Sequence, residues 1–221
     1  MKRRTLDLFL SMGGLALAGL LLVLGLVMTS NANFAKNYVR DQLGQQHISF
    51  TTAAKLTAEE KQSACLVAYA GQALTTGKQA ECYANDYIGL HTTAVAGGRT
   101  YATQGDYITG LKTRLTDAQK ASPPNAATIA DLNTQITAGT AARETLFKGE
   151  TLRGLLLTSF GFSVFGVKGG QVATVAYLLA GLLALLVLAG FAHGLMTSKT
   201  RLVVSPERTK GKVIEPDLAR A

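Results

Sequence analysis

Two long apolar stretches interrupt an otherwise polar sequence. Residues 8–28 and 172–192 each run for 21 residues without a charged side chain. An α-helix rises about 1.5 Å per residue, so about 20 residues cross roughly 30 Å of membrane hydrocarbon. Both stretches are long enough, and we predict a transmembrane helix at each position.

Each stretch has an alternative interpretation. The first resembles a signal peptide because Lys2, Arg3 and Arg4 precede it. However, the apolar core of a signal peptide usually has only about 7–15 residues, and no clear small-residue cleavage site follows Met28. The second could be a buried core helix, which is unusual at this length without a charge. We therefore predict two retained membrane helices.

The segment between these stretches carries helical patterns. Phe34, Tyr38, Leu43 and His47 continue the rhythm of the first stretch, which predicts that its helix runs on out of the membrane. Thr57 and Glu60 have the spacing of a capping box, which predicts a helix that includes Cys65 and ends near Gly71. Further helices are predicted at about 79–95, at 100–120 and from about 126 onward.

An uncharged run of 14 residues begins at Gly154 and is too short to cross a membrane. It contains Phe160, Phe162 and Phe165. Bulky apolar side chains settle at the boundary between headgroups and acyl chains, so we predict an interfacial helix over 154–168. Lys168, Gly169 and Gly170 are expected to break the chain after it, and a re-entrant segment is the alternative.

The sequence thus predicts an all-α membrane protein. Two transmembrane helices flank an extracytoplasmic helical domain, and an interfacial helix precedes the second crossing. The expected organisation is an N-terminal cytoplasmic tail (1–7), transmembrane helix 1 (8–28), the extracytoplasmic helical domain (29–153), the interfacial helix (154–168), transmembrane helix 2 (172–192) and a basic cytoplasmic tail (197–221).

The distribution of lysine and arginine sets the expected orientation. Positive charges close to a crossing tend to stay in the cytoplasm. The tails carry Lys2, Arg3, Arg4, Lys199, Arg201, Arg208, Lys210 and Lys212, whereas the loop side of the crossings carries Lys36, Arg40, Arg153 and Lys168. We therefore expect both termini in the cytoplasm and the domain outside the cytoplasmic membrane. The net charge of +8 is spread along the chain, which favours contact with membrane lipids and not nucleic acid.

Cys65 and Cys82 both lie in the segment expected outside the membrane, where disulfides form and persist. We predict a disulfide between them that staples a helical hairpin with its turn near residues 73–74. By the chain-entropy model such a bridge contributes about 3 kcal/mol. Two separate buried thiols are the alternative.

Small residues recur inside the apolar stretches at a spacing that lets helices approach closely. These residues are Gly14 and Ala18 in the first and Ala176, Ala180 and Ala184 in the second. They predict helix packing in the membrane. The partner could be the other crossing of the same chain, a second copy or a foreign subunit.

Residues suited to catalysis or metal binding are few. The three histidines, His47, His91 and His193, stand in no ligand motif, and His91 with Asp86 and Glu81 is the best local cluster. The apolar stretches contain no charge, which disfavours transport. Accordingly, we expect no catalytic residue, no metal and no cofactor.

Several segments resemble a family of actinobacterial membrane proteins, and together they cover most of the chain. They are RRTLDLFLSMGG, FAKNYVRDQLGQQHISF, YAGQALTTGKQAECYANDYIGLH, GGRTY and LFKGETLRGLLLTSFGFSVFG. The resemblance implies two crossings around an extracytoplasmic helical region. Members are often called aromatic ring-opening dioxygenases, but such enzymes need a metal held by histidine and carboxylate ligands, and this sequence shows no such set.

The leading hypothesis is a non-catalytic membrane protein that acts as a scaffold or an accessory subunit of a larger membrane complex, for example a respiratory supercomplex. Its expected partners are lipids and either other membrane subunits or further copies of itself. The alternative is an extracytoplasmic sensor that binds a lipid or envelope ligand beside Phe160, Phe162 and Phe165.

Overall fold

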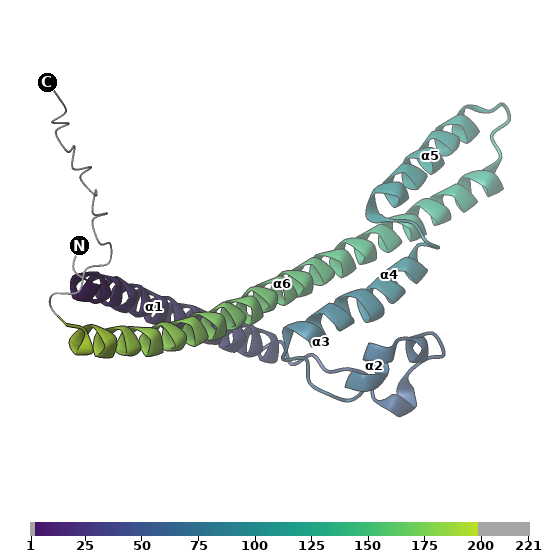
Figure 1. Ribbon diagram of the computed structural model, residues 1–221. Coiled ribbons are helices and arrows are strands. Elements are labelled where there is room, and N and C mark those ends of the chain that lie inside the picture. The colour runs from purple at the N-terminus through teal and green to yellow at the C-terminus, as the bar shows by residue number, and fades with distance from the viewer. Residues whose placement is uncertain (1–2, 199–221) are drawn as a thin grey trace, which may run out of the picture. The chain divides into compact units, whose positions relative to one another are not determined.

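The computed structural model describes residues 3–198, and this part of the chain is helical without a named strand. Its α-helices are α1 (Arg3–Gly44), α2 (Ala64–Tyr69), α3 (Gly77–Cys82), α4 (Gly89–Val95), α5 (Tyr101–Lys120) and α6 (Ala126–Met196) (Figure 1). A π-helix spans Tyr83–Ile88, and two 3₁₀ turns span Ala53–Lys55 and Glu60–Gln62. Most of the predicted C-terminal tail lies outside the described residues.

The chain divides into two compact units. Within the described residues, the helix-pair unit comprises residues 3–27 and 172–198, and the head unit comprises Met28–Gln171. Helices α1 and α6 each contribute residues to both units.

In the helix-pair unit, α1 and α6 pack through small residues. Four small residues and Leu21 recur on α1 at alternating spacings of three and four, the pattern of a left-handed helix pair; the small ones are Ser11, Gly14, Ala18 and Gly25. A methyl group built on Gly14 would lie 2.8 Å from Val187 Cγ2, and one on Gly25 would lie 2.5 Å from the ring of Tyr177. The glycines therefore let the two helices approach closely.

The residues predicted to pack helices lie in this unit. Ala18, Ala176 and Ala180 are buried, and Ala184 is half-buried. Together with the contact of Gly14 with Val187, these positions place the small residues between the two helices of the same chain. This is one of the three partners that the sequence left open.

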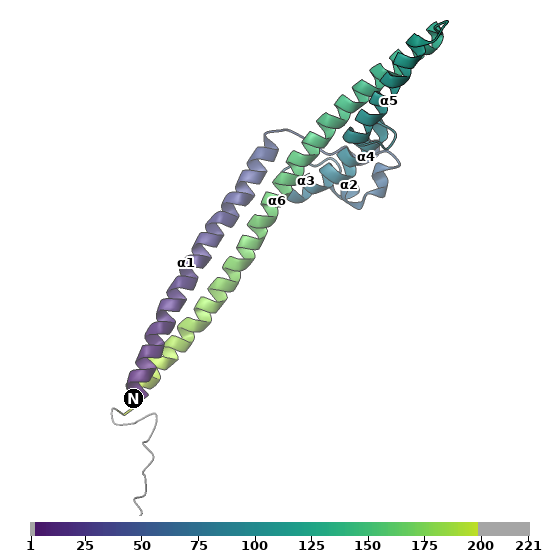
Figure 2. The same ribbon diagram turned by 90° about the horizontal axis from the view of Figure 1, so that it is seen from above.

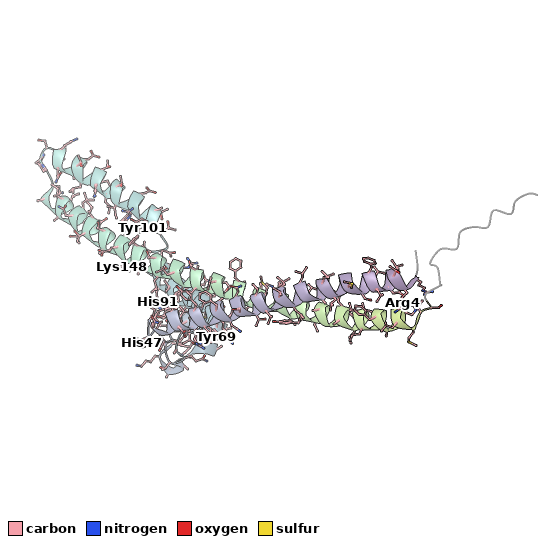
Figure 3. All side chains as sticks on the ribbon, turned by 90° about the vertical axis from the view of Figure 1, so that its left-hand side faces the viewer. Arg4, His47, Tyr69, His91, Tyr101 and Lys148 are labelled. Atoms are coloured by element: carbon pink, nitrogen blue, oxygen red, sulfur yellow. A yellow bond between two sulfur atoms is a disulfide. The ribbon has the colours of Figure 1, made fainter. Side chains whose placement is uncertain are left out.

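Large apolar side chains cover the outside of the helix pair. In the most apolar 18-residue window of α1 only 17% of the residues are buried, and in that of α6 only 22%. The core helix of a soluble protein would be mostly buried. The two helices are thus long and apolar enough to cross a membrane, and their side chains project outward along both (Figure 3).

Helix α6 corrects one prediction. Lys168, Gly169 and Gly170 do not break the chain, because α6 runs without interruption for 71 residues. Consequently, residues 154–168 form no separate helix. A methyl group on Gly169 or Gly170 would come within 4 Å of Ala32 on α1, so these glycines serve close packing of two helices and not a turn.

In the head unit, α3, the π-helix and α4 follow one another along α6, and α5 pairs with the first part of α6 (Figures 1 and 2). Two glycines mark close approaches: Gly77 of α3 lies against Ser163, and Gly149 of α6 lies against Thr92. The buried core of the unit joins α1, the connecting segments, α2, α3, the π-helix and α6. It consists of Val39, Leu43, Phe50, Leu66, Leu74, Ala80, Cys82, Ala84, Ile88 and Leu156.

Local details of the head unit confirm and correct the predicted helices. The first helix runs past the apolar stretch as predicted, but it ends at Gly44, and His47 takes a left-handed backbone conformation with φ 52°. Thr57 and Glu60 exchange the two hydrogen bonds of a capping box, at 3.1 and 2.8 Å. However, they close only a 3₁₀ turn.

Helix α2 begins at Ala64, several residues after the start predicted from Thr57, and Ser63 accepts the hydrogen bond of its N-cap. The later helix starts lie close to their predicted positions. Thr76 and Gln79 form a capping box that starts the next helix two residues before the predicted position. Helices α5 and α6 begin where the sequence predicted.

Candidate functional site

An apolar groove lies in the head unit between the last part of α1 and the middle of α6. It has a volume of about 440 Å³. Its lining is mainly apolar and also offers side-chain amides and hydroxyls, from Tyr38, Val39, Gln42, Leu43, Gln46, Ile48, Leu152, Leu155, Leu156, Thr158, Ser159 and Phe162. The floor belongs to the core, because Val39, Leu43 and Leu156 are buried.

Aromatic rings from both helices gather at one end of the groove. The ring of Phe162 lies 5.8 Å from that of Tyr38 and 6.3 Å from that of Phe34, edge to face in both cases. Phe34 and Tyr38 stack on each other at 5.7 Å. Such pairs stabilise the contact by about 0.5–1.5 kcal/mol beyond the area they bury. The cluster therefore fixes the groove wall.

The side chains at the groove rim are exposed although they are apolar. Leu155 is 62% exposed, and Tyr38, Leu152 and Phe162 lie between 38% and 49%. A contiguous apolar surface of this kind on a folded protein usually marks an interaction site.

The three phenylalanines singled out from the sequence do not form one cluster. Phe162 lines the groove. The ammonium of Lys78 lies over the ring of Phe160, with Nζ 5.0 Å from the ring centre. Phe165 is 78% exposed. Phe34 and Tyr38 were not predicted from the sequence as partners of Phe162. Their spacing of four residues, which places both on one face of a helix, was the available signal.

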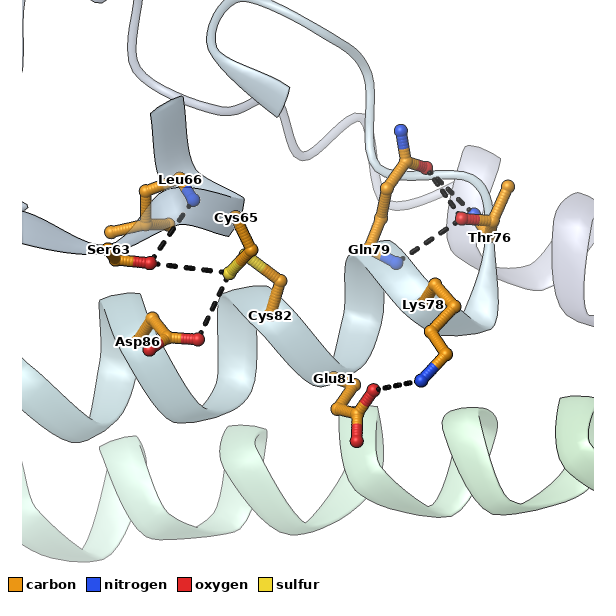
Figure 4. Close-up of a disulfide and its surroundings, with 9 residues drawn as sticks. All are labelled: Ser63, Cys65, Leu66, Thr76, Lys78, Gln79, Glu81, Cys82 and Asp86. Atoms are coloured by element: carbon orange, nitrogen blue, oxygen red, sulfur yellow. Dashed lines mark hydrogen bonds and ion pairs between the residues drawn. A yellow bond between two sulfur atoms is a disulfide. The ribbon is translucent and has the colours of Figure 1, made fainter. Parts of the chain in front are cut away.

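The structure joins Cys65 and Cys82 as a disulfide that ties α2 to the end of α3 (Figure 4). Their Cα atoms are 6.0 Å apart. A carboxylate oxygen of Asp86 lies 3.0 Å from Cys65 Sγ. The two sulfurs and this carboxylate lie close enough to hold a metal ion, but sulfurs bonded to each other are not thiolate ligands. The cluster therefore acts as a cross-link here.

His91, Asp86 and Glu81, the best local candidate cluster in the sequence, do not come together. Asp86 faces the disulfide, and Glu81 pairs with Lys78 at 2.9 Å (Figure 4). His91 instead lies 3.0 Å from Glu60, which is distant in sequence (Figure 3 shows His91).

Glu60 is a buried carboxylate that holds the connecting segment in place. The N–H of Thr57 donates to it at 2.8 Å, and together with His91 this lowers the pKa of the Glu60 carboxyl although burial acts in the opposite direction. The ring of Tyr87 lies 4.6 Å from both His91 and Tyr83. Burial, helped by Tyr87, raises the pKa of Tyr83 to about 12. This cluster is structural, because its groups satisfy each other.

Glu60 should make the head unit sensitive to acid. Its pKa is lower in the folded chain than its usual value of 4.5, so its stabilisation is present above about pH 4.5 and is lost as the pH falls through the folded value. Glu60→Gln should lower the free energy of unfolding by about 1.5 kcal/mol at pH 7 and flatten this acid dependence. Chemical denaturation at pH 7 and pH 3 measures both effects. The control is the exposed neighbour Glu59, because Glu59→Gln should change neither the free energy of unfolding at pH 7 nor its dependence on acid.

A second polar cluster links α6 to the helices beside it. Arg153 donates to Glu150 at 3.4 Å and to Asn85 of the π-helix at 3.2 Å. Thr92 of α4 lies 3.5 Å from Glu150. These bonds fasten the π-helix and α4 to α6.

In the helix-pair unit His193 and Asp7 form a third polar contact, with His193 Nδ1 3.0 Å from Asp7 Oδ2. This contact joins the end of α6 to the start of α1.

Comparisons of the chain with protein-family models, with curated proteins and with solved structures gave no match. The family resemblance drawn from the sequence therefore stays a prediction.

Proposed function

We propose that this chain is a two-span membrane protein whose head unit docks another membrane subunit through the apolar groove. In this proposal both termini lie in the cytoplasm, and the head unit lies outside the cytoplasmic membrane. The protein acts as a non-catalytic accessory subunit or scaffold of a larger complex.

The observation that carries the proposal is the length of the apolar part of α6. From Gly154 to Ala192 the helix has 39 residues and a single charge, Lys168. This corresponds to about 58 Å of helix, while the hydrocarbon is roughly 30 Å thick. A tilt of roughly 60° would be needed to bury it all, but membrane helices tilt by only about 0–40°.

Lys168 indicates where along α6 the membrane hydrocarbon begins. A lysine at the centre of a membrane helix costs about 2.5–3.5 kcal/mol, so the hydrocarbon should begin after it. The 24 residues from Gly169 to Ala192 suffice for the crossing. Residues 154–167 then lie outside the hydrocarbon with several apolar side chains exposed, and these need a different cover.

The groove fits an apolar helix of a partner. Complete burial of one leucine or phenylalanine side chain stabilises a contact by about 1.5–3 kcal/mol, and the rim offers several side chains of this kind. Gln42, Gln46, Thr158 and Ser159 in the lining add hydrogen-bonding groups that could fix the register of a bound helix. A ligand-sensing function has less support, since only Phe162 of the three phenylalanines lines the groove.

The proposal predicts that Leu155→Glu abolishes association. The full chain should be purified in a mild detergent, and a stoichiometric partner or a second copy should be retained by the unchanged protein. Leu155 is exposed, so the substitution should leave the fold intact while it places a charge at the groove rim. Size-exclusion chromatography with light scattering and mass spectrometry measures the loss.

The control is Val67→Glu, which adds the same charge at an exposed apolar position of α2 outside the groove. It should retain the complex. A strictly monomeric unchanged protein, or a complex that survives Leu155→Glu, would contradict the proposal.

A further inference from the structure

A second pocket of the head unit combines an apolar floor with cations. It has a volume of about 420 Å³ and lies between α1, the start of α3 and α6. Val39, Gly166 and Val167 contribute apolar surface, and Lys36 and Arg40 line the same pocket. We infer that this pocket binds one membrane phospholipid with an anionic headgroup, its phosphate held by Lys36 and Arg40.

The charge balance around the pocket favours an anion. Arg40 contacts Asp41 at 3.0 Å, and Lys78 beside the pocket pairs with Glu81. Within the described residues, Lys36 and Lys168 form no ion pair. The positive charge of these two lysines is therefore not neutralised by a neighbouring carboxylate, and a headgroup phosphate would supply that negative charge.

The pocket also lies near the end of the apolar stretches, at the level expected for lipid headgroups. On α6 it reaches Gly170, two residues or about 3 Å before the apolar stretch that begins at Val172. On α1 Lys36 stands eight residues, about 12 Å, after Met28. Side chains on a helix tilt toward its N-terminus, which for α1 is the side of the proposed membrane, and lysine reaches headgroups with its long stem.

The shape of the floor explains how an acyl chain could enter. Gly166 packs against Ala35 so closely that a methyl group on it would lie 2.9 Å from Ala35 Cβ. Because these small residues bring α1 and α6 together, the surface beside them is left open and lined by Val167, which is 59% exposed. An acyl chain of a lipid in the adjacent leaflet would cover this apolar surface while the phosphate meets the cations.

This inference rests on the membrane crossing proposed above but not on the docking groove, whose lining shares Val39 alone with that of this pocket. The test uses native mass spectrometry of the full chain in detergent, with phosphatidylglycerol and phosphatidylcholine of identical acyl chains as probes. One phosphatidylglycerol per chain should be retained, and Lys36→Gln should weaken it roughly fivefold, as expected for the loss of one basic side chain near an anionic group. Lys112→Gln on α5 is the matched control and should have no effect.

A second variant tests the pocket without removing a cation. Val167→Glu places a negative charge on the floor and should also release the lipid, whereas Val164→Glu, one turn away and outside the pocket lining, should not. Equal retention of both lipids, an unchanged affinity in Lys36→Gln, or displacement of the lipid by inorganic phosphate would overturn the inference. The last result would identify a site for free phosphate. Failure of docking would appear separately, in the Leu155→Glu experiment.

Discussion

Replacement of Leu156 by alanine is expected to lower the free energy of unfolding of the head unit by about 3 kcal/mol. Leu156 is only 3% exposed and belongs to the buried core that joins α6 to α1 and to α3. The substitution removes three carbons from a site whose neighbours lie on several elements. They cannot all move inward, so a cavity remains.

The neighbouring residue provides the control for this prediction. Leu155 precedes Leu156 on the same helix but is 62% exposed, so Leu155→Ala should change the free energy of unfolding by less than about 0.5 kcal/mol. Urea denaturation in mild detergent, followed by helical circular dichroism, measures both variants. Equal effects of the two substitutions would show that α6 does not bury Leu156 and expose Leu155.

Loss of the disulfide is expected to have a comparable effect. Cys65 and Cys82 are separated by 17 residues, and a bridge across a loop of this length stabilises the folded chain by about 3 kcal/mol in the chain-entropy model. Helix α2 has only six residues and would be marginal without this tether. The double substitution Cys65→Ser with Cys82→Ser should lower the free energy of unfolding by about this amount.

The reductant supplies an internal control. Dithiothreitol should destabilise the unchanged protein as much as the double substitution does, and it should have no further effect on that variant. If the double variant unfolds at the same urea concentration as the unchanged protein, the bridge does not stabilise the head unit.

The long apolar helices were predictable from the sequence because membrane-spanning length is a property of consecutive residues. The same holds for α5, whose capping residue and periodicity are local. The disulfide could be predicted because its two cysteines flank one turn. Predicting these features requires no information about contacts between residues distant in sequence.

The errors have a common physical cause. Glycine ends a helix in one context and permits close helix packing in another, and Gly169 and Gly170 could be assigned only once Ala32 of α1 was known to lie opposite. The pairing of Glu60 with His91 and that of Phe162 with Phe34 join residues far apart in sequence. Local spacing carries no information about such contacts.

The central claim is that α1 and α6 cross a membrane with the head unit on one side and the ends of the helices on the other. Single cysteines at Thr116 on α5 and at Met196 at the end of α6 test it, because both positions are exposed and Cys65 and Cys82 are bonded to each other. A membrane-impermeant maleimide should label Thr116→Cys in intact cells and Met196→Cys only after permeabilisation. Equal labelling of both positions in intact cells would contradict the claim.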